Sequence, residues 1–121
     1  MKVVLSVRVP KTVEQAVRAN AVRSRMAVAD IVRLILLHSV DGQFNFSKLV
    51  DPPQYLGGKL DVRLPSDLVS QVRREASRFG VSVSVYSRVI LNAYYTKRLV
   101  FVDLGKDRYT LATNREQPNV A

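Results

Sequence analysis

The sequence contains no cysteine, no tryptophan and a single histidine, His38. Without cysteine the chain cannot form a disulfide bond, and it has no thiolate ligand for a zinc or iron–sulfur site. One histidine with no evident partner supports neither a Cys/His metal cluster nor a His-dependent catalytic triad. The carboxylates show no pairing pattern, and no glycine-rich phosphate-binding loop is present. We therefore predict that the protein is not an enzyme and that it needs no metal and no cofactor.

Long apolar runs are also missing. The longest, Ile31–Leu37, contains Arg33 and is far shorter than the roughly 18 apolar residues that a membrane-spanning helix requires. The apolar stretch near Met1 is interrupted by Arg8 and ends at Pro10, and no small-residue cleavage site follows, so it does not fit a signal peptide. We expect a soluble, cytoplasmic protein that does not bind a membrane.

Acidic residues are scarce beside basic ones, since 10 Asp and Glu stand against 19 Lys and Arg and give a net charge of +9. The excess lies in two equal blocks. Residues 1–40 carry seven basic residues against two acidic ones, and residues 59–98 carry eight against three. A basic excess divided in this way favours two equivalent surfaces that face a polyanion. The alternative is that the charge only keeps the protein soluble. With 47% hydrophobic residues, the chain is expected to fold.

The two basic blocks are copies of one another. A shift of 55 positions aligns residues 5–38 with residues 60–93 without a gap and gives twelve identities in 34 positions. The run Leu5–Pro10 falls on Leu60–Pro65, with identical residues at four of its six positions. So many identities in one register indicate an internal duplication.

Each copy predicts one strand followed by two helices. Apolar residues at every second position are typical of a half-buried strand, which ends at Pro10 in the first copy and at Pro65 in the second. The helical spacing of the apolar residues that follow predicts helices at 13–23, 28–39, 68–78 and 83–96. The helix at 28–39 is apolar over most of its circumference and is predicted to be the central core helix.

The ends of these helices carry recognisable signals. Thr12 is expected to cap the first helix of copy one, and Ser66 or Asp67 that of copy two. Gly80 suits the left-handed residue that often ends a helix, whereas Arg25, at the equivalent position of copy one, suits it poorly.

One strand and two helices, repeated once, resemble the ribbon-helix-helix superfamily of Arc, MetJ and CopG. Members of that family normally pair two identical chains; here both halves lie in one chain, as in TraY-type conjugation accessory proteins. A single strand of this length leaves its backbone groups unpaired, so the two strands are expected to pair. The resemblance implies an α+β, mainly α fold: a single-chain pseudodimer with a two-stranded antiparallel ribbon and four helices. Copy one would span residues 1–40 and copy two residues 59–98, joined by a linker at 41–58.

The resemblance also implies where DNA would bind, because the family inserts its ribbon into the major groove. The outward residues of the ribbon would then contact base edges, and these are Val4, Ser6, Arg8, Lys59, Asp61 and Arg63. Pairing about the strand middles places Ser6 opposite Asp61, Arg8 opposite Lys59 and Val4 opposite Arg63. Arg8 and Arg63 suit guanine, and Val4 suits a thymine methyl group. Asp61 either accepts from a cytosine amino group or holds Arg63 and Lys59 in place. The alternative for all six residues is a solvated sheet face.

In this family the N-terminus of each second helix contacts DNA phosphates, since free N–H groups and the helix dipole favour an anion there. The matching positions and nearby residues that can assist them are Ala27, Val28, Arg23 and Arg25 in copy one, and Ser82, Val83, Ser84 and Arg78 in copy two. Copy one lacks a hydroxyl at this place, and Arg23 and Arg25 are expected to compensate.

In the C-terminal segment, residues 99–121, apolar and polar residues alternate over 99–112 around a turn at 105–107. This pattern predicts a β-hairpin formed by 99–103 and 108–112, followed by a flexible tail. Residues 1–112 are expected to form one compact pseudo-twofold domain, and the hairpin is a candidate for self-association or for a protein partner.

We expect the protein to bind double-stranded DNA sequence-specifically, as a transcriptional repressor or as a plasmid or conjugation DNA-processing accessory protein. Because the two ribbon strands differ, its preferred site should be asymmetric. The alternative is a protein-interaction module with the same fold, such as an inhibitor, an antitoxin or an assembly factor. DNA binding that depends on salt and on Arg8 and Arg63 separates these two functions.

Overall fold

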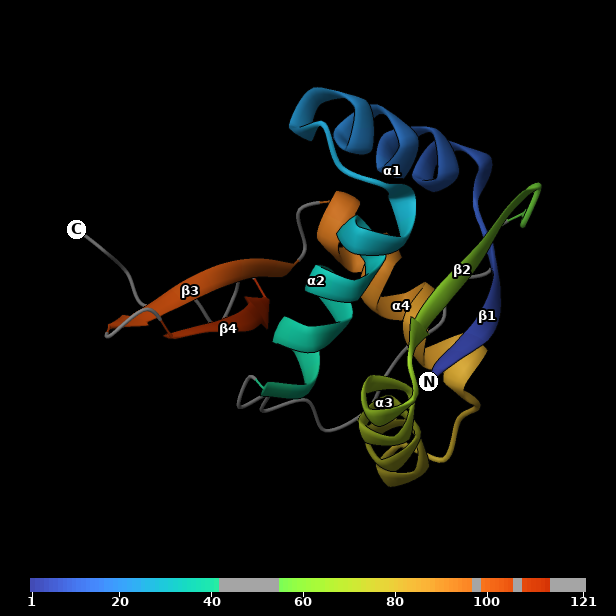
Figure 1. The fold of residues 1–121 in the computed structure, drawn as a ribbon. Coiled ribbons are helices and arrows are strands. Elements are labelled where there is room, and N and C mark those ends of the chain that lie inside the picture. Colours follow the sequence, from blue (N-terminus) through green and yellow to red (C-terminus); the bar gives the residue numbers. More distant parts are fainter. Residues whose placement is uncertain (42–54, 97–98, 106–107, 114–121) are drawn as a thin grey trace.

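The computed structural model describes residues 1–41 and 55–96 in full, together with the backbone of residues 99–105 and 108–113. The elements follow one another as β1 (Lys2–Val9), α1 (Lys11–Ser24), α2 (Val28–Asp41), β2 (Gly58–Pro65), α3 (Ser66–Arg78), α4 (Val83–Tyr95), β3 (Leu99–Gly105) and β4 (Arg108–Thr113) (Figure 1). The predicted mainly α architecture, with four helices and a two-stranded antiparallel ribbon, is confirmed. Its β-α-α-β-α-α order is consistent with a tandem ribbon-helix-helix arrangement. Most of the predicted linker (42–54) and the predicted tail (114–121) lie outside the described residues.

β1 and β2 pair antiparallel along their whole length. The pairs Ser6–Asp61, Arg8–Lys59 and Val4–Arg63 are those predicted from the sequence, so the register is confirmed. Successive side chains of a strand point to opposite faces, and burial follows this alternation. The buried face consists of Leu5, Val7, Val9, Leu60, Val62 and Leu64, each at most 8% exposed.

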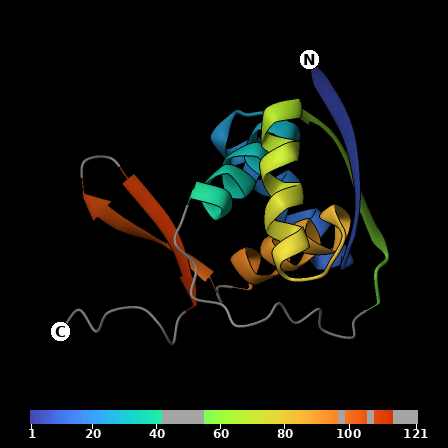
Figure 2. The same ribbon diagram turned by 90° about the horizontal axis from the view of Figure 1, so that it is seen from below.

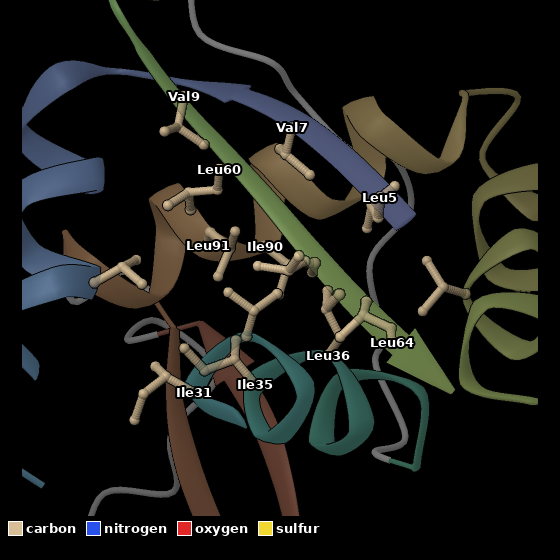
Figure 3. Close-up of a cluster of buried hydrophobic side chains, with 14 of the residues drawn as sticks. Leu5, Val7, Val9, Ile31, Ile35, Leu36, Leu60, Leu64, Ile90 and Leu91 are labelled. Carbon is tan, nitrogen blue, oxygen red and sulfur yellow. The ribbon is translucent and has the colours of Figure 1, made fainter. Parts of the chain in front are cut away.

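The four helices cover this buried face. Figure 1 shows α2 and α4 on one side of the ribbon, with α1 at one end and α3 at the other, and Figure 2 shows the ribbon along one side of the helices. The side chains of β1 and β2 meet those of α2 and α4 in one cluster, whose labelled helical members are Ile31, Ile35, Leu36, Ile90 and Leu91 (Figure 3). Each fully buried aliphatic side chain contributes roughly 1.5–3 kcal/mol, so the ribbon is held chiefly by its apolar face.

α4 is buried more extensively than α2, contrary to the prediction that α2 would be the central helix. Seven of the 13 residues of α4 are buried, against five of the 14 in α2. The buried residues of α4 include Tyr86, which is fully buried and whose hydroxyl lies 3.1 Å from Ser39 Oγ of α2. Ser39 Oγ itself donates to the carbonyl of Leu36 at 2.7 Å, so the tyrosine hydroxyl acts as donor to Ser39. Burial raises the pKa of Tyr86 to about 12.

The predicted caps of the first helices are wrong. α1 begins at Lys11 directly after Pro10, and α3 begins at Ser66 directly after Pro65, with no side-chain cap at either start. Each proline occupies the N-cap position in an extended conformation, and the carbonyl of Pro10 accepts from the backbone of Val13 and Glu14. Because α1 starts two residues earlier than predicted, Thr12 lies within the first turn and not at the cap.

The helix ends agree with the sequence analysis. Gly80 has φ +69° and follows α3. Arg25, at the equivalent position after α1, is also left-handed, with φ 54° and ψ 42°. Its backbone N–H closes the helix by donating to Val22 O at 3.2 Å. A side chain with a Cβ atom is strained in this region, so Arg25 carries a cost that glycine avoids.

β3 and β4 pair antiparallel as a second two-stranded sheet, at the place where the sequence predicts a hairpin. Among the described residues, no helix combines the length and the hydropathy that a membrane crossing needs.

Candidate nucleic-acid interface

The outer face of the ribbon carries the six side chains that the sequence analysis singles out. All six are exposed, and Val4 is 60% exposed. They form three rows across the two strands: Val4 with Arg63, Ser6 with Asp61, and Arg8 with Lys59. The shift of 55 positions that relates the repeats also maps Ser6 onto Asp61 and Arg8 onto Arg63. The pseudo-twofold axis therefore passes through the Ser6–Asp61 row, and the two arginines lie at equivalent places on either side of it.

Of these six residues, Arg8, Lys59 and Arg63 are positively charged and Asp61 is negatively charged. Arg8 and Arg63 form no ion pair within the described part of the chain, so both guanidinium groups keep their donors available. The middle row is different, because Ser6 Oγ donates to Asp61 Oδ1 and Lys59 Nζ lies 3.7 Å from Asp61 Oδ2. Of the two cations that Asp61 was predicted to hold in place, it therefore pairs with Lys59; no ion pair joins it to Arg63 in the described residues.

The sequence analysis missed Glu14, which fixes one end of the ribbon. Its Oε1 accepts from the backbone N–H of Lys59 at 3.2 Å, and its Oε2 accepts from Arg18 Nε at 2.9 Å. The hydrogen bond from Arg18 and then the one from Lys59 hold the pKa of Glu14 below its ordinary value of 4.5. Gly58 makes this approach possible, because a Cβ atom there would lie 2.9 Å from Glu14 Cβ and 3.0 Å from Val9 O. The second repeat has Val69 at the position equivalent to Glu14, and this difference between the repeats is the only sign in the sequence that Glu14 has a special role.

The N-terminus of α4 lies against β1. Ser82 caps the helix by accepting from the backbone N–H of Val85 at 3.1 Å. Ser84 Oγ donates to the carbonyl of Ser6 at 3.1 Å, so this hydroxyl binds the ribbon and is not directed at solvent. The first N–H groups of a helix, here those of Val83 and Ser84, have no intrahelical partner and suit an anion. Ser84 was predicted to assist phosphate binding with its hydroxyl; it instead positions the helix end relative to the ribbon.

The N-terminus of α2 differs from that of α4. The carbonyl of Ala27 accepts from Asp30 and Ile31, which marks Ala27 as the cap position, with Val28 as the first helical residue. Asp30 lies in the first turn, and its carboxylate is 3.8 Å from Arg33 Nη2 and about half exposed. A carboxylate here occupies the positive end of the helix dipole and repels a second anion. The two predicted phosphate-binding positions are therefore not equivalent, and that of α4 is the more favourable.

The predicted basic neighbours Arg23, Arg25 and Arg78 are all exposed. Arg23 lies in the last turn of α1, and Arg25 follows that helix in the left-handed conformation. Arg78 ends α3, where its guanidinium lies 3.5 Å from Glu75 and its Cζ lies 5.2 Å from the centroid of the Phe79 ring. An exposed pair of this kind contributes little, and Arg78 keeps donors for a further partner.

No protein-family model, no curated protein and no solved structure matches this chain significantly. In the part of the chain that the structure describes, no group of three or more His, Cys, Asp or Glu side chains is placed to hold a metal ion.

Proposed function

We propose that the protein binds double-stranded DNA sequence-specifically by inserting the β1–β2 ribbon into the major groove, as a tandem member of the ribbon-helix-helix superfamily. The observation that carries the proposal is the outer face of the ribbon. Its six predicted side chains are exposed, it is backed by a packed core, and it presents Arg8 and Arg63 at equivalent positions about a pseudo-twofold axis.

The major groove of B-DNA is about 12 Å wide and admits a two-stranded ribbon. An arginine whose guanidinium is free of other partners can donate two hydrogen bonds to guanine O6 and N7, and such a contact gives about 1–3 kcal/mol of discrimination. Within residues 1–41 and 55–96, neither Arg8 nor Arg63 has a side-chain partner for its guanidinium group. Val4, exposed beside Arg63, can contact a thymine methyl group.

Phosphate contacts on either side of the groove would come from the N-termini of the second helices. α4 is the stronger candidate because Ser82 caps it and Ser84 ties its first turn to β1. At α2 the carboxylate of Asp30 opposes an anion, and Arg25 and Arg23 supply the nearby positive charge. We infer that the two halves of the protein hold DNA with unequal strength.

The biological role is proposed from the resemblance to fused ribbon-helix-helix proteins of the TraY type. Repression of transcription on a mobile element and the processing of plasmid or conjugative DNA both require an accessory protein that recognises one DNA site. These two roles use the same interface.

The proposal is tested by fluorescence anisotropy with random duplexes and with duplexes selected by the wild-type protein, at several salt concentrations. The variant Arg8→Ala/Arg63→Ala removes both ribbon arginines. Its matched control is Arg73→Ala/Arg74→Ala, since Arg73 and Arg74 are also exposed but lie on α3. Both double variants remove two positive charges, so a purely electrostatic effect would be the same in both.

We expect the selected duplex to bind far more tightly than random DNA, and the ribbon variant to lose that preference while the control keeps it. Each phosphate neutralised contributes about −0.9 to the slope of log affinity against log salt concentration. Weak binding without sequence preference, and with equal effects of the two double variants, would refute the proposal. It would favour the alternative of a protein partner.

A further inference from the structure

The two repeats differ in chemistry in the middle row of the ribbon. The pseudo-twofold axis passes between Ser6 and Asp61, so one strand brings a hydroxyl and the other a carboxylate to the same place. On either side of this row Arg8 and Arg63 are identical side chains at equivalent positions. A difference on the axis therefore affects the centre of whatever the ribbon contacts.

The contacts of this row leave acceptors facing outward. An ionised carboxylate only accepts hydrogen bonds, so the bond between Ser6 Oγ and Asp61 Oδ1 uses the hydroxyl hydrogen of Ser6. Ser6 is then left with lone pairs only. The carboxylate has about four acceptor positions. One is taken by Ser6 and one is directed towards Lys59, and the side chain of Asp61 is still 54% exposed.

The charge of Asp61 opposes the approach of the ribbon to DNA, and Lys59 offsets it. Lys59 Nζ lies 3.7 Å from Asp61 Oδ2, and its side chain is 51% exposed. The hydroxyl of Ser6 on one side and the ammonium of Lys59 on the other hold the carboxylate in one orientation. An acceptor fixed in this way loses little freedom when it binds a donor.

Bases differ in what they present to such an acceptor. In the major groove cytosine offers its N4 amino group and adenine its N6 amino group, whereas guanine O6 and N7 and thymine O4 are themselves acceptors. We propose that Asp61, held by Ser6 and Lys59, selects cytosine or adenine on the DNA strand that it faces at the centre of the site and rejects guanine and thymine there. This inference depends on the proposed function and specifies the DNA that the ribbon binds.

The selection also gives the site a direction. The arginines at equivalent positions favour guanine on both sides of the centre and by themselves do not distinguish the two orientations of the protein. Hydrogen bonds to a charged acceptor are roughly twice as strong as neutral ones, so Asp61 outweighs Ser6. The orientation that places an amino group under Asp61 is therefore favoured over the reversed one.

The experiment uses duplexes obtained by selection with the wild-type protein, in which the central base pair is then changed to each of the four possibilities. Affinities are measured for wild type, for Asp61→Ser and for Asp67→Ser. The first variant makes the middle row symmetric, with serine on both strands. The second removes the same charge from the exposed first turn of α3, away from the ribbon, and corrects for the general gain in affinity that follows the loss of a carboxylate.

We expect wild type and Asp67→Ser to distinguish the best from the worst central base pair by roughly five- to hundredfold, with cytosine or adenine preferred on one strand. In Asp61→Ser this ratio should fall to about twofold or less, while the preference for the flanking bases is retained. An unchanged order and spread of affinities in Asp61→Ser would overturn the inference. So would a wild-type protein that depends on its flanking bases but is indifferent to the centre, and in that case the proposed function would stand. A wild-type protein without any preference over random DNA would overturn both.

Discussion

Replacing Arg25 by glycine should stabilise the protein and weaken its binding to DNA. Arg25 ends α1 with φ 54°, whereas the second repeat has Gly80 with φ +69° at the equivalent position. The left-handed conformation costs a residue with a Cβ atom roughly 1–2 kcal/mol. Glycine adds conformational freedom to the unfolded chain, which lowers the gain in stability by about 0.4–1 kcal/mol. The net gain expected for Arg25→Gly is therefore about 0.5–1 kcal/mol in the free energy of unfolding.

Two further variants separate backbone strain from charge. Arg25→Ala removes the guanidinium but keeps a Cβ atom at the same φ, so it should not share the gain in stability. Gly80→Ala places a Cβ atom where nothing lies within 4 Å, so it meets no steric clash and should lose about 1 kcal/mol through backbone strain alone. Urea unfolding followed by circular dichroism measures all three variants.

The same variants report on the role of Arg25 as a phosphate contact. Arg25→Gly and Arg25→Ala should lower DNA affinity equally and reduce the salt slope by about 0.9, because both remove one cation. If Arg25→Ala stabilised the fold as much as Arg25→Gly, charge repulsion among the arginines would be the cause, and the argument from backbone strain would be wrong. A Gly80→Ala variant as stable as wild type would contradict it as well.

Three other changes have defined outcomes. Because the pKa of Glu14 is lowered in the folded protein, its carboxylate contributes stability that is fully present above the unfolded pKa of 4.5 and is lost as pH falls below it. In Glu14→Gln the urea concentration at the unfolding midpoint should therefore depend less on pH between about pH 6 and pH 3. The raised pKa of Tyr86, about 12 against 10.0, gives stability that is present below pH 10 and is lost as pH rises through about 12. Tyr86→Phe should remove this alkaline loss of about 2–3 kcal/mol, whereas Tyr55→Phe, at an 89% exposed position, should not. Asp30→Asn should raise DNA affinity about two- to fivefold by removing a carboxylate from the first turn of α2, and an unchanged affinity would place the phosphates elsewhere.

The fold was predictable because the duplication constrains it twice. Alternation in Leu5–Val9 and again in Leu60–Leu64 fixes which face of each strand is buried, and a shift of one residue would expose every apolar side chain. The pairing of Ser6 with Asp61 follows once the two strands are placed symmetrically. Long-range hydrogen bonds produce no repeated pattern in the sequence from which they could be predicted. The bond from the Lys59 backbone to Glu14 spans 45 positions and occurs at one end of the ribbon only.

The N-caps of the first helix in each repeat were predicted wrongly for a different reason. A hydroxyl or carboxylate near the start of a helix predicts a cap, yet proline can occupy the N-cap position itself, because it has no N–H to leave unsatisfied and its φ is already near −60°. Thr12 and Ser66 are then helical residues. At α4, which no proline precedes, the hydroxyl of Ser82 takes the capping role and accepts from the backbone N–H of Val85.

The fusion of the two repeats makes an asymmetric ribbon chemically possible. In a symmetric homodimer every residue occurs twice, so a carboxylate on the twofold axis would face its own copy, and two like charges directly opposite each other on a ribbon are destabilising. In this chain the axis carries one carboxylate and one hydroxyl, and the hydroxyl satisfies the carboxylate. The starts of the second helices also differ between the repeats, since Asp30 of α2 has Val85 as its equivalent in α4. Buried positions such as Leu5 and Leu60 are identical in the two repeats, whereas the exposed positions include both an identical pair, Arg8 and Arg63, and a different one, Ser6 and Asp61. A non-palindromic DNA site is the partner that such divergence fits.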